Sequence, residues 1–396
     1  MDEIIPMKPT SSEENSVYHP VLKVLGLGGG GCNAVNRMIE LGLSGVEFIA
    51  ANTDAQALKD CLAPAKIQLG PRVTRGLGAG GQPEVGEAAA FESSKELAAA
   101  LSGADLVFLT AGMGGGTGTG SIPVAAEIAR KSGAVTVAVV TTPFGFEMGR
   151  RQRNSTEGLT RLNQHTDTLI AIANDRLLGM RGGNLTIDLA FRVADDVLRQ
   201  AIQGITELIT EPGLINVDFS NVRRLMKLGG GAFLAIGQGQ GEDKVDEALH
   251  KALNHPLVDQ ISLEHASGIL VNFTGGEDLS LFEVNDALLK LQEQANPDTE
   301  IVMGVINDQR MNGRVQAILI VTGLGARTLE EILPGSEKIH IAPKPTEQKS
   351  SVREILEAEI TTEPESLPHI PPTNNLDLPA FLRRERYTGQ SYSSGN

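Results

Sequence analysis

The stretch 112–121, GMGGGTGTGS, lies between the apolar run 104–111 and the helix-like run 122–133. Glycine loses more conformational freedom on folding than any other residue, so this concentration at a strand–helix junction needs a physical reason. Glycines there let backbone N–H groups approach a ligand without a Cβ, and the helix N-terminus adds partial positive charge. The stretch therefore predicts a phosphate cradle, with the hydroxyls of Thr117 and Thr119 as further donors.

Strand-like and helix-like segments alternate on both sides of this stretch. Segment 21–31 is an apolar run that leads into a glycine turn, and 32–43 has helical periodicity with Ala34, Met38 and Leu41 on one face. Further strand-like runs lie at 46–54, 104–113 and 134–144. This alternation predicts parallel βαβ units, and hence a doubly wound α/β sheet.

Segment 187–210 keeps helical periodicity over its whole length, which corresponds to roughly 35 Å, before Pro212 and Gly213 end it. Its predicted buried stripe comprises Phe191, Ala194, Leu198, Ile202, Ile205 and Ile209. A second, smaller α/β domain is predicted at 221–331. Its strand-like runs are 231–239, 266–275, 300–308 and 315–323.

The composition is that of a globular chain with about two domains, since its 396 residues are 41% hydrophobic and 21% charged. The net charge of −15 disfavours non-specific binding to nucleic acid or to an anionic membrane. No apolar run approaches the ~20 residues of a membrane span. Cys32 and Cys61 make no disulfide framework, so we expect two small core thiols in a reducing cytoplasm.

Both ends of the chain differ in composition from the rest. Residues 1–18 are acidic and polar, which is typical of a disordered tail and not of a signal peptide. Residues 332–375 are rich in Pro, Glu, Ser and Thr and predict a disordered linker. The segment 376–387, LDLPAFLRRERY, is apolar and then basic. It is typical of a docking peptide that folds on a partner, with a frayed terminus as the alternative.

Two other nucleotide-binding motifs share part of the glycine pattern. A P-loop is excluded because no lysine follows the last glycine of the opening stretch. Gly26, Gly28 and Gly31 match GxGxxG, so an oxidoreductase that uses a dinucleotide stays an alternative. The ribose-binding carboxylate of that motif has no clear counterpart, since Glu47 begins the second strand and Asp54 lies beyond it.

The chain has three glycine-rich turns, at 28–31, 76–81 and 114–120. A dinucleotide-binding enzyme needs one such turn, and an ordinary tight turn needs only a single glycine. Several cradles on one sheet predict a ligand with several phosphates that is held from several loops.

The order of these motifs resembles the tubulin/FtsZ superfamily, in its bacterial FtsZ form. The phosphate-loop signature GGGTGTG at 114–120 is joined by seven stretches in the family's order. They are GLGGGGCNAVNRM (26–38), NTDAQAL (52–58), GLGAGGQPEVG (76–86), TTPFGFE (141–147), NDRLL (174–178), VLRQAIQGITELIT (197–210) and GLINVDFSNV (213–222). The resemblance covers 21–330 and the terminal peptide.

The resemblance implies a GTP-binding, filament-forming protein of bacterial-type cell division. It implies a GTP-binding domain at 19–186, a central helix at 187–210, a synergy loop at 211–220 and a C-terminal domain at 221–331. GTP or GDP would be the nucleotide. The residues that the resemblance assigns to it are Gly29, Gly30, Gly31, Cys32, Asn33, Gly116, Thr117, Gly118, Glu147, Arg151, Asn174, Phe191 and Asp195.

The residue types suit these roles. A carboxylate such as Asp195 can accept both the ring N–H and the amino N–H of guanine, and Phe191 can stack on the base. Plainer explanations stay open at this point. Phe191 lies on the apolar stripe, Asp195 could complement a helix dipole, and Arg151 belongs to a basic run that could be a solvated face.

The length of the central helix predicts a filament. The fifteen residues from Asp195 to Thr210 span about 22 Å, so a nucleotide near Asp195 cannot have its phosphates at Asp218 of the same chain. If Asp218 acts in hydrolysis, it must act on the nucleotide bound by a neighbouring subunit. A head-to-tail contact of this kind that does not close generates a filament. The resemblance implies this arrangement, with hydrolysis dependent on assembly.

The synergy loop departs from the family pattern. The family has Asn, Asp and a second Asp, whereas this chain has Asn216, Asp218 and Asn221. An amide can orient a water molecule but cannot accept its proton. One hypothesis is therefore a filament that binds GTP and hydrolyses it weakly; the other is that Asp218 suffices. Mg²⁺ is expected on the phosphates, without a dedicated protein motif.

By resemblance, the terminal peptide recruits the membrane tethers and regulators of division. Its docking residues would be Leu376, Leu378, Pro379, Phe381, Leu382 and Arg383. The expected location is the cytoplasm at the division site, with any membrane contact indirect. The chain's main partner would be itself.

Overall fold

The structure is a computed structural model, and it describes residues 19–323 except 148, 180–185, 212, 230 and 255–262. The tail at 1–18, the linker at 332–375 and the peptide at 376–387 lie outside the described residues.

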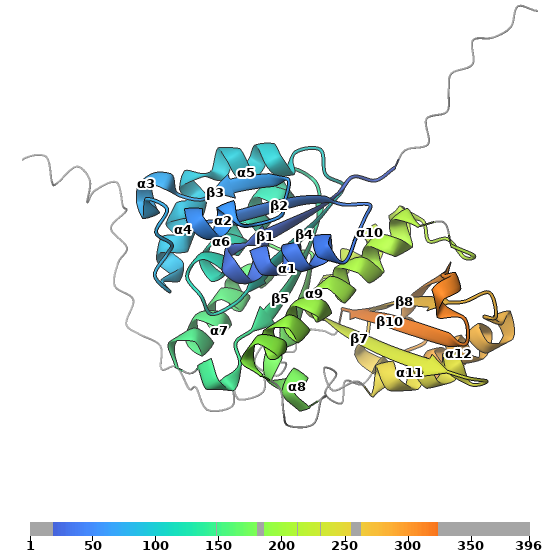
Figure 1. Cartoon of the computed structure of the whole chain (residues 1–396). Helices are drawn as coiled ribbons and strands as arrows, with labels where there is room; N and C mark the ends of the chain where they lie inside the picture. The colour runs from blue at the N-terminus through green and yellow to red at the C-terminus, as the bar shows by residue number, and fades with distance from the viewer. Residues whose placement is uncertain are drawn as a thin grey trace, which may run out of the picture. The chain divides into compact units, whose positions relative to one another are not determined.

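A parallel sheet forms the N-terminal part of the described chain, in the order β3-β2-β1-β4-β5-β6 (Figure 1). Each strand pairs in parallel with its neighbour, which confirms the predicted doubly wound sheet. The strand order reverses at β1 and β4, and ligands of such sheets bind beyond the carboxyl ends of the strands at this point. The strands are β1 (Leu22–Leu27), β2 (Glu47–Asn52), β3 (Ala65–Gln68), β4 (Leu106–Gly112), β5 (Val135–Thr142) and β6 (Thr168–Ala173).

Two helices begin earlier than predicted. Helix α1 begins at Gly28 and α6 at Thr117, so residues of the glycine stretches form their first turns. Glycine is a poor helix former, and packing of the two N-termini against each other overrides this preference. The helices of this part are α1 (Gly28–Glu40), α2 (Ala55–Lys59), α3 (Pro71–Thr74), α4 (Pro83–Glu92), α5 (Ser94–Leu101), α6 (Thr117–Lys131), α7 (Arg150–Asn163) and α8 (Asn174–Gly179), with the 3-10 turn η1 (Gly145–Glu147).

The central helix α9 (Ile187–Thr210) has the predicted bounds. It contacts α1, β5 and β9. The predicted stripe is buried except at two positions: Ile209 is partly buried, and Phe191 is 40% exposed. Leu41, expected on the buried face of α1, is also exposed, because it is the C-cap residue beyond the end of that helix.

The C-terminal part of the described chain continues the same sheet. Strand β7 pairs in parallel with β6 at two positions, Leu169–Gly231 and Ile170–Ala232, and then antiparallel with β10. Strand β10 pairs antiparallel with β8, and β8 in parallel with β9, so ten strands form one sheet. The elements are α10 (Phe219–Met226), β7 (Gly231–Gln240), α11 (Lys244–Leu253), η2 (Leu263–His265), β8 (Gly268–Gly275), α12 (Leu281–Gln294), β9 (Glu300–Asn307), η3 (Gln309–Met311) and β10 (Arg314–Thr322).

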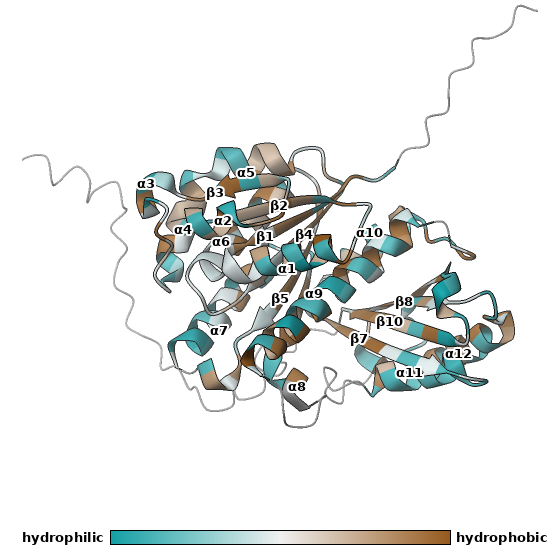
Figure 2. Cartoon of the chain, viewed as in Figure 1, coloured by the Kyte–Doolittle hydropathy of each residue, from teal (hydrophilic) through white to brown (hydrophobic). Residues whose placement is uncertain are grey.

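Apolar side chains cover both faces of the sheet, and Figure 2 shows its strands as largely hydrophobic. Neighbours on β1 point to opposite faces, so Val24 joins the cluster beneath α1 and α9 while Leu25 joins the cluster beneath α4 to α6. The first cluster runs on through α9 to Leu234 and Ile318 of the C-terminal strands. A shared core of this kind makes the position of α9 depend on both halves. None of the helices within the described ranges is long and apolar enough to cross a membrane.

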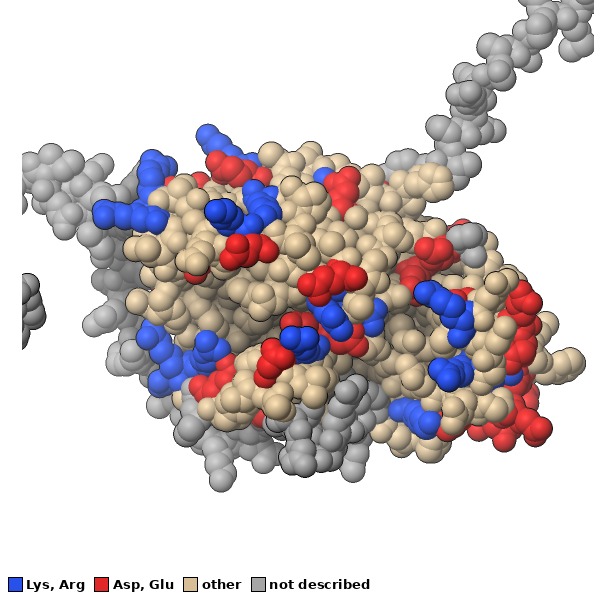
Figure 3. Space-filling view, in the orientation of Figure 1, with Lys and Arg blue, Asp and Glu red and all other residues tan. Residues whose placement is uncertain are grey.

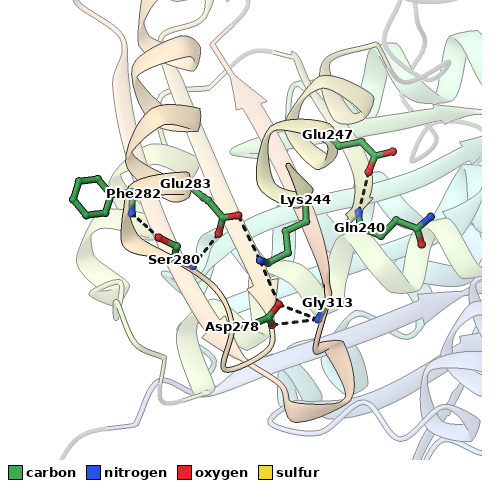
Figure 4. Close-up of polar contacts among 8 residues, drawn as sticks. All are labelled: Gln240, Lys244, Glu247, Asp278, Ser280, Phe282, Glu283 and Gly313. Carbon is green, nitrogen blue, oxygen red and sulfur yellow. Dashed lines mark hydrogen bonds and ion pairs between the residues drawn. The ribbon is translucent and has the colours of Figure 1, made fainter. Parts of the chain in front are cut away.

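A buried lysine anchors the start of α12 (Figure 4). Lys244 is 5% exposed, and its Nζ lies 3.3 Å from an Asp278 carboxylate oxygen and 3.4 Å from Glu283 Oε1. Asp278 also accepts the Gly313 N–H, and Glu283 completes a capping box with Ser280. These contacts join the loop before α12 to α11 and to the start of β10.

Candidate nucleotide site

Helices α1 and α6 begin side by side at the carboxyl ends of β1 and β4. Their N-cap residues, Leu27 and Gly116, make no side-chain cap, and neither helix has an acidic residue in its first turn. The first N–H groups of both helices therefore have no helical acceptor. Two such N-termini in contact, at the switch point of a parallel sheet, form an edge suited to anionic groups.

The glycines explain how the two N-termini come so close. A Cβ on Gly28, whose φ is +70°, would lie 2.7 Å from the backbone N of Gly118. A Cβ on Gly116 would lie 2.7 Å from the backbone N of Gln82, so the turn at 76–81 and the start of α4 close on the same loop. By contrast, a Cβ on Gly29 or Gly115 would meet nothing within 4 Å. Some glycines thus let backbones pack together, and others leave backbone open to a ligand.

The two threonines of the opening stretch have different surroundings. Thr117 Oγ1 lies 2.6 Å from Thr53 Oγ1, at the rim of the cradle. Thr119 is buried, and its hydroxyl accepts the Gly114 N–H at 2.8 Å. Thr119 was predicted to be a further donor to the ligand, and its burial at 2% exposure disfavours that role.

A second layer of side chains fixes the loops. Asn154 donates through Nδ2 to the carbonyl oxygens of Gly81 (3.3 Å) and Gly114 (3.2 Å), so one amide joins two glycine-rich turns. Glu147 and Arg151, both assigned to the nucleotide by the resemblance, form an ion pair with each other. Glu147 Oε1 also accepts the Phe144 N–H at 3.0 Å. The carboxylate is therefore fixed, while most of the Arg151 side chain stays exposed.

An aromatic corner lies at the start of α9. The ring of Phe144 stacks on Phe146 with centroids 5.2 Å apart, and it meets Phe191 edge-on at 5.3 Å. Phe191 nevertheless stays 40% exposed, whereas a residue that served only the core would be buried. Its partial exposure therefore favours the prediction that this ring receives a base.

Asp195 lies one turn further along α9 and is half-buried. Burial raises the pKa of its carboxyl to about 7, and the nearby Arg37 guanidinium opposes this shift. Asn174, at the start of α8, is 4% exposed, and its Oδ1 has no hydrogen-bond partner within the described residues. A buried amide oxygen without a donor and a carboxyl poised near neutrality are both groups that a polar ligand would complete.

The remaining residues of the first loop divide between core and surface. Gly29, Gly30 and Asn33 are exposed, whereas Gly31 and Cys32 are buried. Burial and the neighbouring Cys61 raise the pKa of the Cys32 thiol to about 12. Cys32 therefore offers a ligand only its backbone, and both cysteines are free and buried, as expected.

The loop at the far end of α9 carries the other predicted polar residues. It is pinned to β9, because Leu214 N donates to Val305 O and Ile215 bridges to the same strand. Asn216 Oδ1 accepts the Gly213 N–H at 2.7 Å and so closes the loop. Asp218 is the N-cap residue of α10 but makes no side-chain cap, and its exposed carboxylate has no partner among the residues described.

Charge is distributed unevenly over the face in Figure 3. Lys and Arg side chains gather over α3 and beside α7, and Asp and Glu crowd the edge beyond α12. Helix α7 alone contributes three exposed arginines, Arg150, Arg151 and Arg153. No group of three or more His, Cys, Asp or Glu side chains suited to a metal ion occurs in the described part of the chain. The anionic groups of a ligand would thus meet backbone N–H groups and arginine.

Several residues of this site were not predicted. Thr53 lies within the motif NTDAQAL, but its contact with Thr117 depends on the fold. Asn154, Arg37 and Phe144 take part through contacts across 40 residues or more of sequence. Only the clustering of polar residues after the basic run at 150–153 could have drawn attention to Asn154.

Comparison with known proteins identifies the family. Residues 21–182 match the model of the Tubulin/FtsZ family, GTPase domain, and residues 230–325 match that of the FtsZ family, C-terminal domain. The chain is similar to the structure titled "FtsZ dimer, empty (M. jannaschii)", with 43% identity, coverage of 83% of this chain and 96% of that one, and a TM-score of 0.76. It is also similar to a tryptophan-to-tyrosine mutant of M. jannaschii FtsZ, with 46% identity, 77% and 91% coverage, and a TM-score of 0.74.

A likeness of fold extends to a more distant protein. The structure titled "CetZ2 from Haloferax volcanii - GTPgS bound protofilament" has 18% identity, covers 79% of this chain and 96% of that one, and gives a TM-score of 0.66. The GTPase family match sets aside the alternative of a dinucleotide-dependent oxidoreductase. The chain belongs to the tubulin/FtsZ family, and it is a GTP-binding, self-associating GTPase of the filament-forming cell-division type.

Proposed function

We propose that GTP binds at the N-termini of α1 and α6 and is hydrolysed only when the loop 211–221 of a second subunit reaches it. The observation that carries this proposal is the pair of half-sites at opposite ends of α9. Asp195 lies near the start of the 24-residue helix, and the exposed Asp218 lies beyond its end. The fifteen residues between Asp195 and Thr210 alone separate the two ends by about 22 Å.

In this proposal the residues divide into binding and hydrolysis. The cradle of Gly29, Gly30, Gly31, Gly116, Thr117 and Gly118 holds the phosphates, and the corner of Phe191, Asp195 and Asn174 holds the base. Asp218 of the next subunit takes a proton from water as its oxygen bonds to the γ-phosphorus and the bond to GDP breaks. The Asn216 side chain holds the loop that presents Asp218.

The residues of this site fit a Mg²⁺ ion that is bound mainly by the phosphates of the nucleotide. The cradle supplies hydroxyl and backbone groups without a carboxylate cluster, and Mg²⁺ commonly keeps several waters while the phosphates provide its other ligands. When bound there, it would offset phosphate charge. The protein residues would then have only to place the phosphates.

The first experiment measures GTP turnover and light scattering together, over a series of protein concentrations with Mg²⁺. Turnover and scattering that rise together above one critical concentration support hydrolysis completed by a neighbour. GTP-dependent scattering with little phosphate release supports the alternative, a filament former with weak hydrolysis because position 221 is Asn. Turnover proportional to protein concentration, without a threshold, contradicts the proposal.

A mixing experiment tests whether two subunits share the site. One variant, Asp218→Ala, binds GTP but lacks the carboxylate; the other, Asp195→Ala, keeps Asp218 but binds GTP poorly. Each alone should hydrolyse slowly, and their mixture should be faster than the sum of both. If the hydrolysis rate of the mixture equals the sum of the two separate rates, Asp218 acts on the nucleotide of its own subunit.

We also propose that the segment 376–387 docks membrane tethers and regulators, which would bring filaments to the membrane at the division site in the cytoplasm. The apolar first half and basic second half of LDLPAFLRRERY support this. Deletion of 376–396 should leave GTP-dependent assembly unchanged and abolish localisation of the protein at the division site. Unchanged localisation would contradict the docking role.

A further inference from the structure

Arg224 connects Asn221 to the start of β9. Its Nε donates to both carboxylate oxygens of Glu300, at 3.0 and 3.1 Å, and its Nη2 also donates to Glu300. The same Nη2 lies 3.4 Å from Oδ1 of Asn221, one turn earlier on α10. Glu300 is the first residue of β9, so the guanidinium is held from two elements.

This contact determines which way the Asn221 amide faces. A guanidinium carries only donors, so the amide must turn its oxygen toward Arg224. Its NH₂ group then points away from Arg224. Asn221 follows Asp218 by three residues at the start of the same helix, and both lie where the loop 211–221 would meet a second subunit.

We propose that Arg224, fixed by Glu300, is a positioning residue that makes Asn221 a hydrogen-bond donor to the γ-phosphate of the neighbouring subunit's GTP. This inference rests on the proposed function. A phosphate oxygen is the acceptor that suits an NH₂ group, and its negative charge strengthens the bond. Donation to the attacking water would instead engage one of its two lone pairs and make its oxygen a weaker nucleophile. Asp218 is then the sole carboxylate of the pair, and position 221 stabilises phosphate charge.

The role of Arg224 depends on the residue at 221. With Asn221, the guanidinium turns the amide into the donor orientation. With an aspartate there, the same guanidinium would form an ion pair with it, lower its pKa and weaken it as a proton acceptor. Removal of Arg224 should therefore lower kcat when residue 221 is asparagine and should not lower it when residue 221 is aspartate. A residue that only supports the helix would have the same effect in both.

A double-mutant cycle on the full chain tests this inference. Asn221→Ala and Arg224→Met should each lower kcat for GTP about tenfold at protein concentrations far above the critical concentration, with KM unchanged. The double variant should be no slower than either single variant. Lys227→Met, which removes the same charge from the exposed end of α10, should keep the wild-type kcat and is the matched control.

A second arm uses the aspartate background. Arg224→Met should lower kcat when residue 221 is Asn and should not lower it in Asn221→Asp. A third arm measures the critical concentration with a non-hydrolysable GTP analogue, which does not depend on turnover. Asn221→Ala and Arg224→Met should raise it by the same factor, because both lose one contact with the γ-phosphate.

The outcomes separate this inference from the proposed function. The positioning role is overturned if the losses in kcat from Asn221→Ala and Arg224→Met multiply in the double variant. It is also overturned if Arg224→Met lowers kcat equally in the aspartate background. In both cases the proposal of a site shared by two subunits still stands. Wild-type protein that assembles without hydrolysis overturns the proposed hydrolysis, and the analogue arm then decides the role of Arg224. Absence of nucleotide-dependent assembly overturns both.

Discussion

Asp195 shows how one half-buried carboxyl can make nucleotide binding depend on pH. In the free protein its pKa is raised to about 7 by burial. Only the ionised form can accept both N–H groups of a guanine edge, so binding should release a proton. GTP affinity should therefore increase with pH across neutrality, and binding at pH 6 should be about tenfold weaker than at pH 8. Dissociation constants measured at pH 6, 7 and 8 would check this.

The control for this prediction is Asp195→Asn. The amide cannot accept both N–H groups at any pH, so its affinity should be low and nearly independent of pH. GDP should show the same pH trend as GTP in the wild type, because the base and not the γ-phosphate makes the contact. If the affinity of the wild type for GTP does not change with pH, Asp195 does not bind the base.

The same residue makes a prediction about stability without nucleotide. A carboxyl whose folded pKa lies above its unfolded value binds protons more tightly in the folded state, so its contribution to stability falls as pH rises from about 4 to 7. Above that range the folded protein carries the cost of a partly desolvated charge. Asp195→Asn should therefore raise the Tm of the nucleotide-free protein at pH 8 and change it little at pH 4. Thermal unfolding at both pH values checks the sign.

At the scale of elements, the start of α6 depends on the absence of a side chain at Gly116. A Cβ there would lie 2.7 Å from Gln82 N, so Gly116→Ala must push the loop away from the start of α4. We expect a loss of about 1–3 kcal/mol in the free energy of unfolding and weaker GTP binding. Gly115→Ala is the matched control for folding, since its Cβ would meet nothing within 4 Å. Equal Tm values for the two variants would contradict this account.

The buried lysine at the start of α11 makes a second prediction at this scale. Lys244→Met should lower the Tm, because it leaves the carboxylates of Asp278 and Glu283 without their shared cation. Lys251→Met, which breaks an exposed ion pair on the same helix, should change the Tm little. The Gly313 N–H lowers the pKa of Asp278, so its contribution to stability should disappear as pH falls below about 4. Tm values of both variants at pH 7 test the difference.

At the scale of the whole molecule, α9 couples the two halves of the described chain. One apolar cluster runs from Leu22 through α9 to Ile320, and β6 pairs with β7 across the junction. We expect calorimetry to show a single unfolding transition for this part of the chain, with GTP raising its midpoint. Two resolved transitions, with only the first moved by GTP, would show that the halves unfold independently.

The sequence by itself determined the class of fold and the kind of ligand. Strand and helix periodicities predicted β1, β2, β4 and β5 of the parallel sheet, the four C-terminal strands and the bounds of α9, because these patterns are local and repeat over many residues. Strands β3 and β6 were not predicted. The glycine-rich turns and the order of motifs indicated a GTP-binding protein of the tubulin/FtsZ family. The weaker predictions were the first turns of α1 and α6, because glycine propensity argued against helices that tertiary contacts stabilise.

Only the tertiary structure decided how individual side chains are used. It turned Thr119 inward to hold its loop, left Phe191 partly exposed beside Phe144, and placed Arg224 between Asn221 and Glu300. Each of these outcomes depends on a contact with another loop, strand or helix turn, and no local pattern reports the direction in which a side chain points. The chemistry of position 221 follows from that direction. When Arg224 binds the amide oxygen of Asn221, the NH₂ group is left to act as a hydrogen-bond donor.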